Sequence, residues 1–122
     1  AIPDAHEDAA TMAAMSLLKL MRRCDLLPED IGKIHIGTES AVDEAKAIGT
    51  YVIGMLEKVY GPGSFQHCST VEFKSACIGT TLALESISYW VAADEGERVG
   101  VVIASDVAKY PLGSSAEYTQ GA

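Results

Sequence analysis

Apolar residues recur along this chain with two different spacings, and the two spacings alternate. Apolar positions three and four residues apart are typical of a helix, whereas apolar residues at every second position are typical of a strand. The pattern predicts helices over 5–24, 41–60 and 77–93 and strands over 33–38, 69–73 and 98–105. Asp4, with Glu7 three residues later, is expected to cap the first helix. This alternation of elements favours a layered α/β fold.

Two of these elements are too apolar to face water. The strand "RVGVVIAS" is a nearly continuous apolar run, which is typical of a sheet covered on both faces. The helix over 77–93 has little polar surface, so we expect it to be buried as well. A sheet of only three strands is too small to bury so much apolar surface. The chain is therefore expected to be an incomplete domain, which its first residue, Ala1, and its polar tail "SSAEYTQGA" also favour.

Composition narrows the class of protein. The 122 residues carry a formal net charge of −8, which argues against a protein that tracks nucleic-acid phosphates. No apolar run approaches the roughly 20 residues that span a bilayer, so no membrane partner is expected. The three cysteines form no even disulfide framework, and their spacing does not predict a zinc site. We expect free thiols in a cytoplasmic protein.

Cys77 stands in the stretch "FKSACIGTT", where a predicted strand gives way to a predicted helix. The first backbone N–H groups of a helix lack partners within it, so they stabilise a nearby thiolate or an oxyanion formed by attack on a thioester. Small neighbours leave room for an acyl group. A free cysteine is also among the residue types most often buried in a core. On these grounds alone, Cys77 is either a nucleophile or a small core residue.

Polar residues also follow the other two strands. Glu39 comes just after the first strand, and Asp106 and Tyr110 follow the third. Ligands collect beyond the carboxyl ends of strands in α/β sheets, so Glu39, Cys77 and Asp106 are expected at one edge if the strands are parallel neighbours. A carboxylate there can act as a general base. Alternatively, Glu39 and Ser40 cap the next helix.

Three stretches of the chain resemble one enzyme family. "GTESAVDEAKA", "ACIGTTLALE" and "VVIASDVAKY", the last followed by "EYTQGA", are similar to motifs of 3-hydroxy-3-methylglutaryl-CoA synthases, which belong to the thiolase superfamily. The likeness extends over nearly the whole chain, and the "GPGSFQHCSTVEF" connection resembles archaeal-type members. The resemblance implies a thiolase-like layered αβαβα fold. Residues 1–122 would be most of its N-terminal half, with upstream strands and the C-terminal half absent.

The resemblance also implies a role for each candidate residue. Cys77 would accept the acetyl group of acetyl-CoA, and Glu39 would act as the acid/base that drives condensation with acetoacetyl-CoA. Water would then release 3-hydroxy-3-methylglutaryl-CoA, an intermediate of the mevalonate pathway to isoprenoids. Asp106 and Tyr110 match residues that line the substrate site, and Thr119 matches a threonine of the same site. This chain has Ile78 where some family members have an aromatic residue after the cysteine, a departure that concerns the detail of the acyl pocket and not the nucleophile.

Partners follow from the same resemblance. The CoA thioesters are substrates, and the chemistry requires no further cofactor and no metal. A homodimer is implied through the strand at 69–73, and archaeal-type members also associate with an acetoacetyl-CoA thiolase. The family's histidine that orients acetoacetyl-CoA would lie in the C-terminal half, and none of His6, His35 and His67 matches it. The 122-residue chain alone is therefore expected to be inactive.

Two related enzyme classes and one non-enzyme remain alternatives. Ketoacyl-ACP synthase III shares the cysteine but has no glutamate that matches Glu39. Polyketide β-branching synthases share both residues and take a carrier-protein-bound substrate. A scaffold that kept the thiolase fold without catalysis is disfavoured by the presence of Cys77, Glu39 and Asp106 together.

Overall fold

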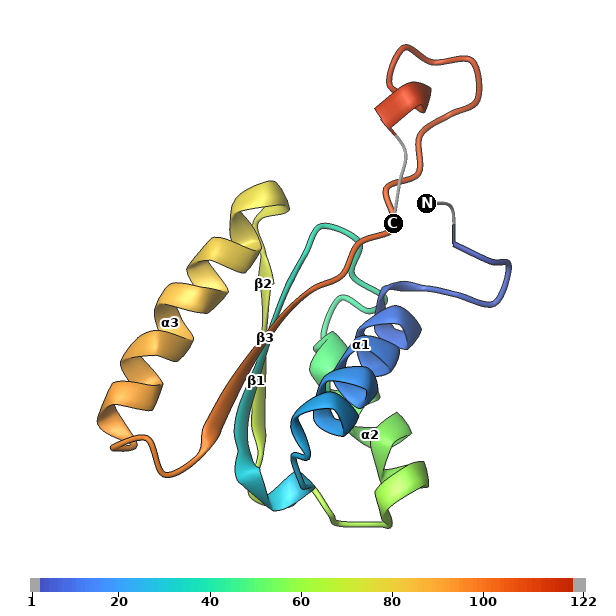
Figure 1. The fold of residues 1–122 in the computed structure, drawn as a ribbon. Helices are drawn as coiled ribbons and strands as arrows, with labels where there is room; N and C mark the ends of the chain where they lie inside the picture. The colour runs from blue at the N-terminus through green and yellow to red at the C-terminus, as the bar shows by residue number, and fades with distance from the viewer. Residues whose placement is uncertain (1–2, 120–122) are drawn as a thin grey trace.

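The computed structural model describes residues 3–119, which form a parallel sheet with helices on both faces (Figure 1). The three strands are β1 (Ile31–Thr38), β2 (Ser69–Lys74) and β3 (Val99–Ala104), in the spatial order β2-β1-β3. The helices are α1 (Ala9–Cys24), α2 (Ile48–Tyr60) and α3 (Gly79–Ala93). Both strand pairs are parallel. The predicted α/β class and all three predicted strands are confirmed, and no helix within 3–119 is long and apolar enough to cross a bilayer.

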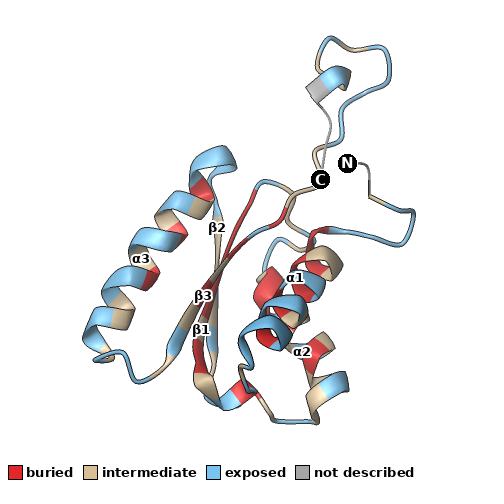
Figure 2. Ribbon diagram, in the orientation of Figure 1, coloured by how far each residue is buried: buried red, intermediate tan, exposed pale blue. Residues whose placement is uncertain are grey.

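Two helices, α1 and α2, cover one face of the sheet and enclose the main core with it (Figure 2). The largest fully buried side chains there are supplied by all three elements: Leu17 and Met21 of α1, Ile34 and Ile36 of β1, and Val52 of α2. Each such side chain contributes about 1.5–3 kcal/mol by leaving water. This face therefore holds most of the stabilising apolar contact.

The third helix, α3, covers the other face by itself (Figure 1). Ala83 and Ile87 are buried against the sheet, whereas Leu84 and Tyr89 are 56% and 70% exposed on the outer side. The prediction that this helix is buried holds for its sheet-facing side and is wrong for its outer side, because among the described residues only one layer packs against it. Its apolar composition therefore exceeds what this part of the chain covers.

The first helix begins later than predicted, and a different residue caps it. The Asp8 carboxylate accepts a hydrogen bond of 2.8 Å from the Thr11 N–H, and the Thr11 hydroxyl accepts one of 2.8 Å from the Asp8 N–H. This reciprocal pair satisfies two of the N–H groups at the start of α1. Asp4 and Glu7 instead close a separate turn, in which the Asp4 N–H donates to Glu7 Oε2 at 2.8 Å.

The other two helices are also shorter at their starts than the pattern predicts. Residues 39–47 form a loop rather than the first turns of α2, because the Asp43 carboxylate accepts from the N–H groups of Ala45 and Lys46 at 2.8 and 2.9 Å. Helix α3 begins at Gly79, two residues after Cys77, which lies in a short 3-10 turn. Both differences affect the candidate site, since each concerns a segment that carries one of its residues.

Candidate active site

The carboxyl ends of the three strands lie at the same edge of the sheet. In the register, Thr38 of β1 pairs with Lys74 of β2, and Gly37 pairs with Ala104 of β3. Glu39 follows its strand by one residue, Asp106 by two and Cys77 by three. The expectation that parallel neighbouring strands deliver these residues to one edge is therefore confirmed.

Asp106 fixes the start of the loop that carries Glu39. Its Oδ1 atom accepts from the Glu39 N–H at 2.6 Å and from the hydroxyl of fully buried Thr38 at 2.9 Å. The same hydroxyl accepts from the Ser40 N–H at 3.0 Å, and Ser40 Oγ accepts from the Val107 N–H at 3.0 Å. The carboxylate thus binds the backbone of Glu39 and leaves the side chain of Glu39 exposed.

Cys77 is exposed in the 3-10 turn between β2 and α3. The preceding residue, Ala76, has φ of 44°, a conformation that costs a non-glycine residue about 1–2 kcal/mol. Cys77 therefore follows directly after a backbone conformation that alanine disfavours. Such strain is found disproportionately at active sites.

The small residues around Cys77 allow α3 to begin against the sheet. A Cβ on Gly79 would lie 2.6 Å from the Phe73 carbonyl oxygen, and a Cβ on Gly37 would collide with the backbone of Thr80. Backbone therefore packs on backbone where β1 meets the start of α3. The same glycines bring the turn that carries Cys77 next to β1, the strand that leads into Glu39.

Two of the predicted site residues are not drawn into this cluster. The segment after β3 extends away from the sheet (orange to red in Figure 1), and Tyr110 on it is 39% exposed. Thr119 belongs to the short 3-10 turn Glu117–Thr119, and its side chain lies outside the described residues. Their proposed contacts with substrate remain predictions.

The remaining cysteines differ from Cys77 in position. Cys24 is exposed at the end of α1, and Cys68 packs against the main core, where burial raises the pKa of its thiol to about 11. A raised pKa disfavours the thiolate, which is the nucleophilic form, so Cys68 is less suited than an ordinary thiol to act as a nucleophile. Within residues 3–119, no group of three or more His, Cys, Asp and Glu side chains is placed to hold a metal ion.

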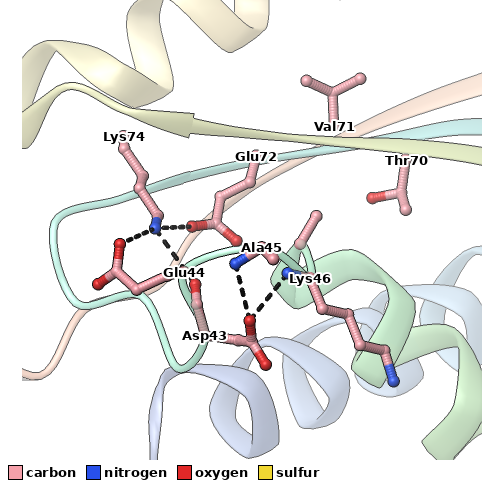
Figure 3. Close-up of a pocket in the computed structure, with 9 residues that line it drawn as sticks. Asp43, Glu44, Ala45, Lys46, Thr70, Val71, Glu72 and Lys74 are labelled. Carbon is pink, nitrogen blue, oxygen red and sulfur yellow. Dashed lines mark hydrogen bonds and ion pairs between the residues drawn. The ribbon is translucent and has the colours of Figure 1, made fainter.

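Sequence reasoning missed a set of polar residues beside the Glu39 loop. A pocket of about 390 Å³ lies between the loop and β2, lined by Asp43, Glu44, Lys46, Glu72 and Lys74 among others (Figure 3). The signal was present in the sequence of β2. Its alternate residues are polar, which places Thr70, Glu72 and Lys74 on the side opposite the apolar residues Val71 and Phe73.

Comparison with known proteins assigns the chain to a family. The sequence profile of "Hydroxymethylglutaryl-coenzyme A synthase N terminal" matches residues 1–122. A hydroxymethylglutaryl-CoA synthase of Haloferax volcanii is 46% identical over 121 residues, which are 98% of this chain and 27% of that protein. The chain thus spans about a quarter of the length of this relative.

Solved structures agree with this assignment. A structure described as MvaS in complex with 3-hydroxy-3-methylglutaryl coenzyme A superposes with a TM-score of 0.85 at 32% identity, over 99% of this chain and 28% of that one. An HMG-CoA synthase complexed with CoA gives 0.78 at 34% identity, over 93% and 27%. The fold is therefore thiolase-like, as predicted. By sequence profile, by relatives and by fold, the chain belongs to the hydroxymethylglutaryl-CoA synthase family and corresponds to its N-terminal region.

Proposed function

We propose that this chain is the part of a cytoplasmic hydroxymethylglutaryl-CoA synthase that carries the nucleophile and the acid/base, and that it is inactive without the remaining length of the enzyme. The reaction would join acetyl-CoA and acetoacetyl-CoA in the mevalonate pathway. One observation carries the proposal: an exposed cysteine on a strained turn lies at the sheet edge where Asp106 holds the backbone of Glu39 at 2.6 Å. The complexes of similar proteins with 3-hydroxy-3-methylglutaryl-CoA and CoA support acyl-CoA substrates.

The first half of the reaction uses Cys77. Its thiolate attacks the carbonyl carbon of acetyl-CoA, a new C–S bond forms, and the C–S bond to CoA breaks as CoA leaves and takes up a proton. N–H groups at the start of α3 are suited to stabilise the oxyanion of this step. The product is an acetyl thioester on Cys77, which keeps the methyl protons acidic enough for the next step.

The second half uses Glu39. Its carboxylate removes a proton from the acetyl methyl group, and the resulting carbanion attacks the ketone carbon of acetoacetyl-CoA. The proton on Glu39 then passes to the new alkoxide. Water cleaves the thioester to Cys77, which releases 3-hydroxy-3-methylglutaryl-CoA and regenerates the thiol. Asp106 contributes by keeping the Glu39 backbone in place, while substrate contacts of Tyr110 and Thr119 are part of the proposal.

The edge of the sheet supplies a further element of the proposal. Strand β2 is at the end of the described sheet, and Val71 on it is 44% exposed. An exposed edge strand is a template for pairing with another chain, and a second copy is the occupant implied by family resemblance. The proposal therefore includes a homodimer and, by resemblance alone, a complex with acetoacetyl-CoA thiolase. Sedimentation of the full-length protein tests the dimer.

Mass spectrometry of the full-length protein after incubation with acetyl-CoA tests the chemistry. We expect an acetyl adduct on Cys77 in the wild type and in Glu39→Gln, and none in Cys77→Ser. Only the wild type should form 3-hydroxy-3-methylglutaryl-CoA when acetoacetyl-CoA is added, and the 122-residue chain alone should not. No adduct at saturating acetyl-CoA would support the non-catalytic scaffold instead.

A further inference from the structure

Helix α2 begins without a cap of its own. Its N-cap residue is Ala47, which has no side chain that can accept from the first N–H groups of the helix. Glu72 of β2 supplies the missing acceptor, because its Oε2 atom accepts from the Ile48 N–H at 2.7 Å. The side chain of Glu72 is only 6% exposed. A carboxylate at this point is favoured by the positive end of the helix dipole.

Lys74, two residues later on the same side of β2, binds the loop itself. Its Nζ donates to the Asp43 carbonyl oxygen at 3.2 Å and lies 4.0 Å from Glu72 Oε1 (Figure 3). That Oε1 atom is buried and makes no hydrogen bond, so the lysine is its nearest compensating charge. The contact of Lys74 with fully exposed Glu44, at 3.7 Å, adds little because water screens it.

The Asp43 side chain then ties the loop to the body of α2. Its carboxylate accepts from the Ala45 and Lys46 N–H groups and from the Tyr51 hydroxyl at 3.0 Å, and these bonds lower its pKa. Residues 39–47 are thus anchored twice. Asp106 holds the end that carries Glu39, and Glu72 with Lys74 holds the other end.

We propose that Glu72 and Lys74 are positioning residues that fix the far end of the 39–47 loop, and through it Glu39, to the strand that leads into Cys77. The inference rests on the proposed function, since it assigns Glu39 to condensation. Cys77 follows Lys74 by three residues, so one strand sets the place of both the nucleophile and the base. Loss of the anchor displaces Glu39 and leaves the route from β2 to Cys77 in place.

The two halves of the reaction separate this role from a general structural one. Acetylation of Cys77 does not use Glu39, whereas condensation does. In the full-length synthase, Glu72→Ala is expected to slow condensation about 100-fold, the scale of a misplaced catalytic group. Acetylation of Cys77 should stay within about threefold of wild type, because its geometry is not altered. Lys74→Met should give the same split with a smaller loss.

Two matched variants complete the experiment. Glu72→Gln keeps an oxygen that accepts from the Ile48 N–H, so it should recover much of the condensation rate. Glu57→Ala removes a carboxylate that accepts from the Gly63 N–H at 3.1 Å, which is the same kind of bond at the opposite end of α2. It should leave the ratio of condensation to acetylation at its wild-type value.

Hydrogen exchange of loop 39–47 gives a readout independent of activity. We expect the loop amides to exchange faster in Glu72→Ala than in the wild type, and at the wild-type rate in Glu57→Ala. The inference would be overturned if Glu72→Ala slowed acetylation and condensation equally, or if it left both the loop exchange and the two rates unchanged. If Glu72→Ala does not fold, the same criteria apply to Lys74→Met and Glu72→Gln. A wild-type protein that forms no Cys77 adduct would defeat the proposed function instead, and the exchange result would still decide the anchor.

Discussion

The two faces of the sheet are built on different principles. On the face covered by α1 and α2, the central strand presents the buried side chains of Ile34 and Ile36. On the face covered by α3, the same strand presents His35 and Gly37, where the ring contacts Phe73 and the glycine admits the backbone of Thr80. One face gains stability from apolar volume. The other gives up volume so that a helix start, and the cysteine ahead of it, can approach the strand.

One sheet therefore has a face that mainly stabilises the fold and a face that mainly positions the proposed site. The α1/α2 face excludes water from large side chains, which is the main source of stability. The α3 face has fewer buried side chains and more exposed apolar ones, yet Cys77, the proposed nucleophile, lies just ahead of the helix that covers it. Substitutions on the two faces should therefore have different consequences, and three pairs of variants measure the contrast.

The largest expected effect is on the α1/α2 face. Leu17 is 1% exposed, so Leu17→Ala should lower the free energy of unfolding by about 3 kcal/mol through lost burial and a residual cavity. Leu84 on the outer side of α3 is 56% exposed, and Leu84→Ala should cost less than about 0.5 kcal/mol. Urea unfolding of the 122-residue chain measures both.

The same pair in the full-length protein sharpens the contrast. If the proposed C-terminal half covers α3, as the thiolase-like architecture implies, Leu84→Ala should become more costly there than in the 122-residue chain. Equal costs for Leu17→Ala and Leu84→Ala within the short chain would contradict the view that its two faces differ.

A smaller effect is expected where β1 meets α3. Gly37→Ala places a methyl group against the Thr80 backbone and should cost about 2 kcal/mol, since a well-packed contact cannot absorb the added volume. It should also slow acetylation of Cys77 in the full-length protein. Gly54→Ala is the matched control, because beyond its own helix backbone and chain neighbours nothing lies within 4 Å of a Cβ at this position, and it should stabilise by about 0.5–1 kcal/mol. Thermal unfolding gives the two opposite signs, and a stabilising Gly37→Ala would contradict the close approach.

The smallest expected effect is a dependence on pH. Burial lowers the pKa of His35 below its ordinary value of 6.5, an effect only partly offset by its hydrogen bond to the Ala83 carbonyl. The unfolded chain therefore takes up the proton first, and stability should fall as pH drops below about 6.5. His35→Phe keeps a ring and should flatten this dependence, whereas His6→Gln, at an exposed position, should not. Urea unfolding midpoints measured across pH 5–8 compare the two variants. If the slope of stability against pH is unchanged in His35→Phe, another group is responsible for it.

Local patterns predicted β1 and β3 well because apolar residues at every second position are also buried there. Ile34, Ile36, Val101 and Ile103 all lie in the core, so the sequence pattern and the packing give the same result. The three strand ends could be placed at one edge without knowledge of any contact between them. The Gly37–Gly79 approach could not be predicted, since it depends on atoms 42 positions apart in the chain.

The errors arose where tertiary contacts replaced local propensity. Residues 41–47 have helical composition, yet Asp43 takes the amide groups that a helix would use, and Glu72 caps the helix at Ile48 instead. The apolar character of α3 was read as burial, although its outer side has no covering layer among residues 3–119. In both cases the missing information lay in a different part of the fold.

At Ala76, a substitution that stabilises the fold is expected to harm the proposed catalysis. A survey for stabilising changes would select Ala76→Gly, because glycine adopts φ near 44° without the steric penalty of a Cβ. The same change would give the turn more backbone conformations and leave the position of the Cys77 thiol less well fixed. A thermostable version of this domain should therefore draw its added stability from the α1/α2 face and keep alanine at this bend.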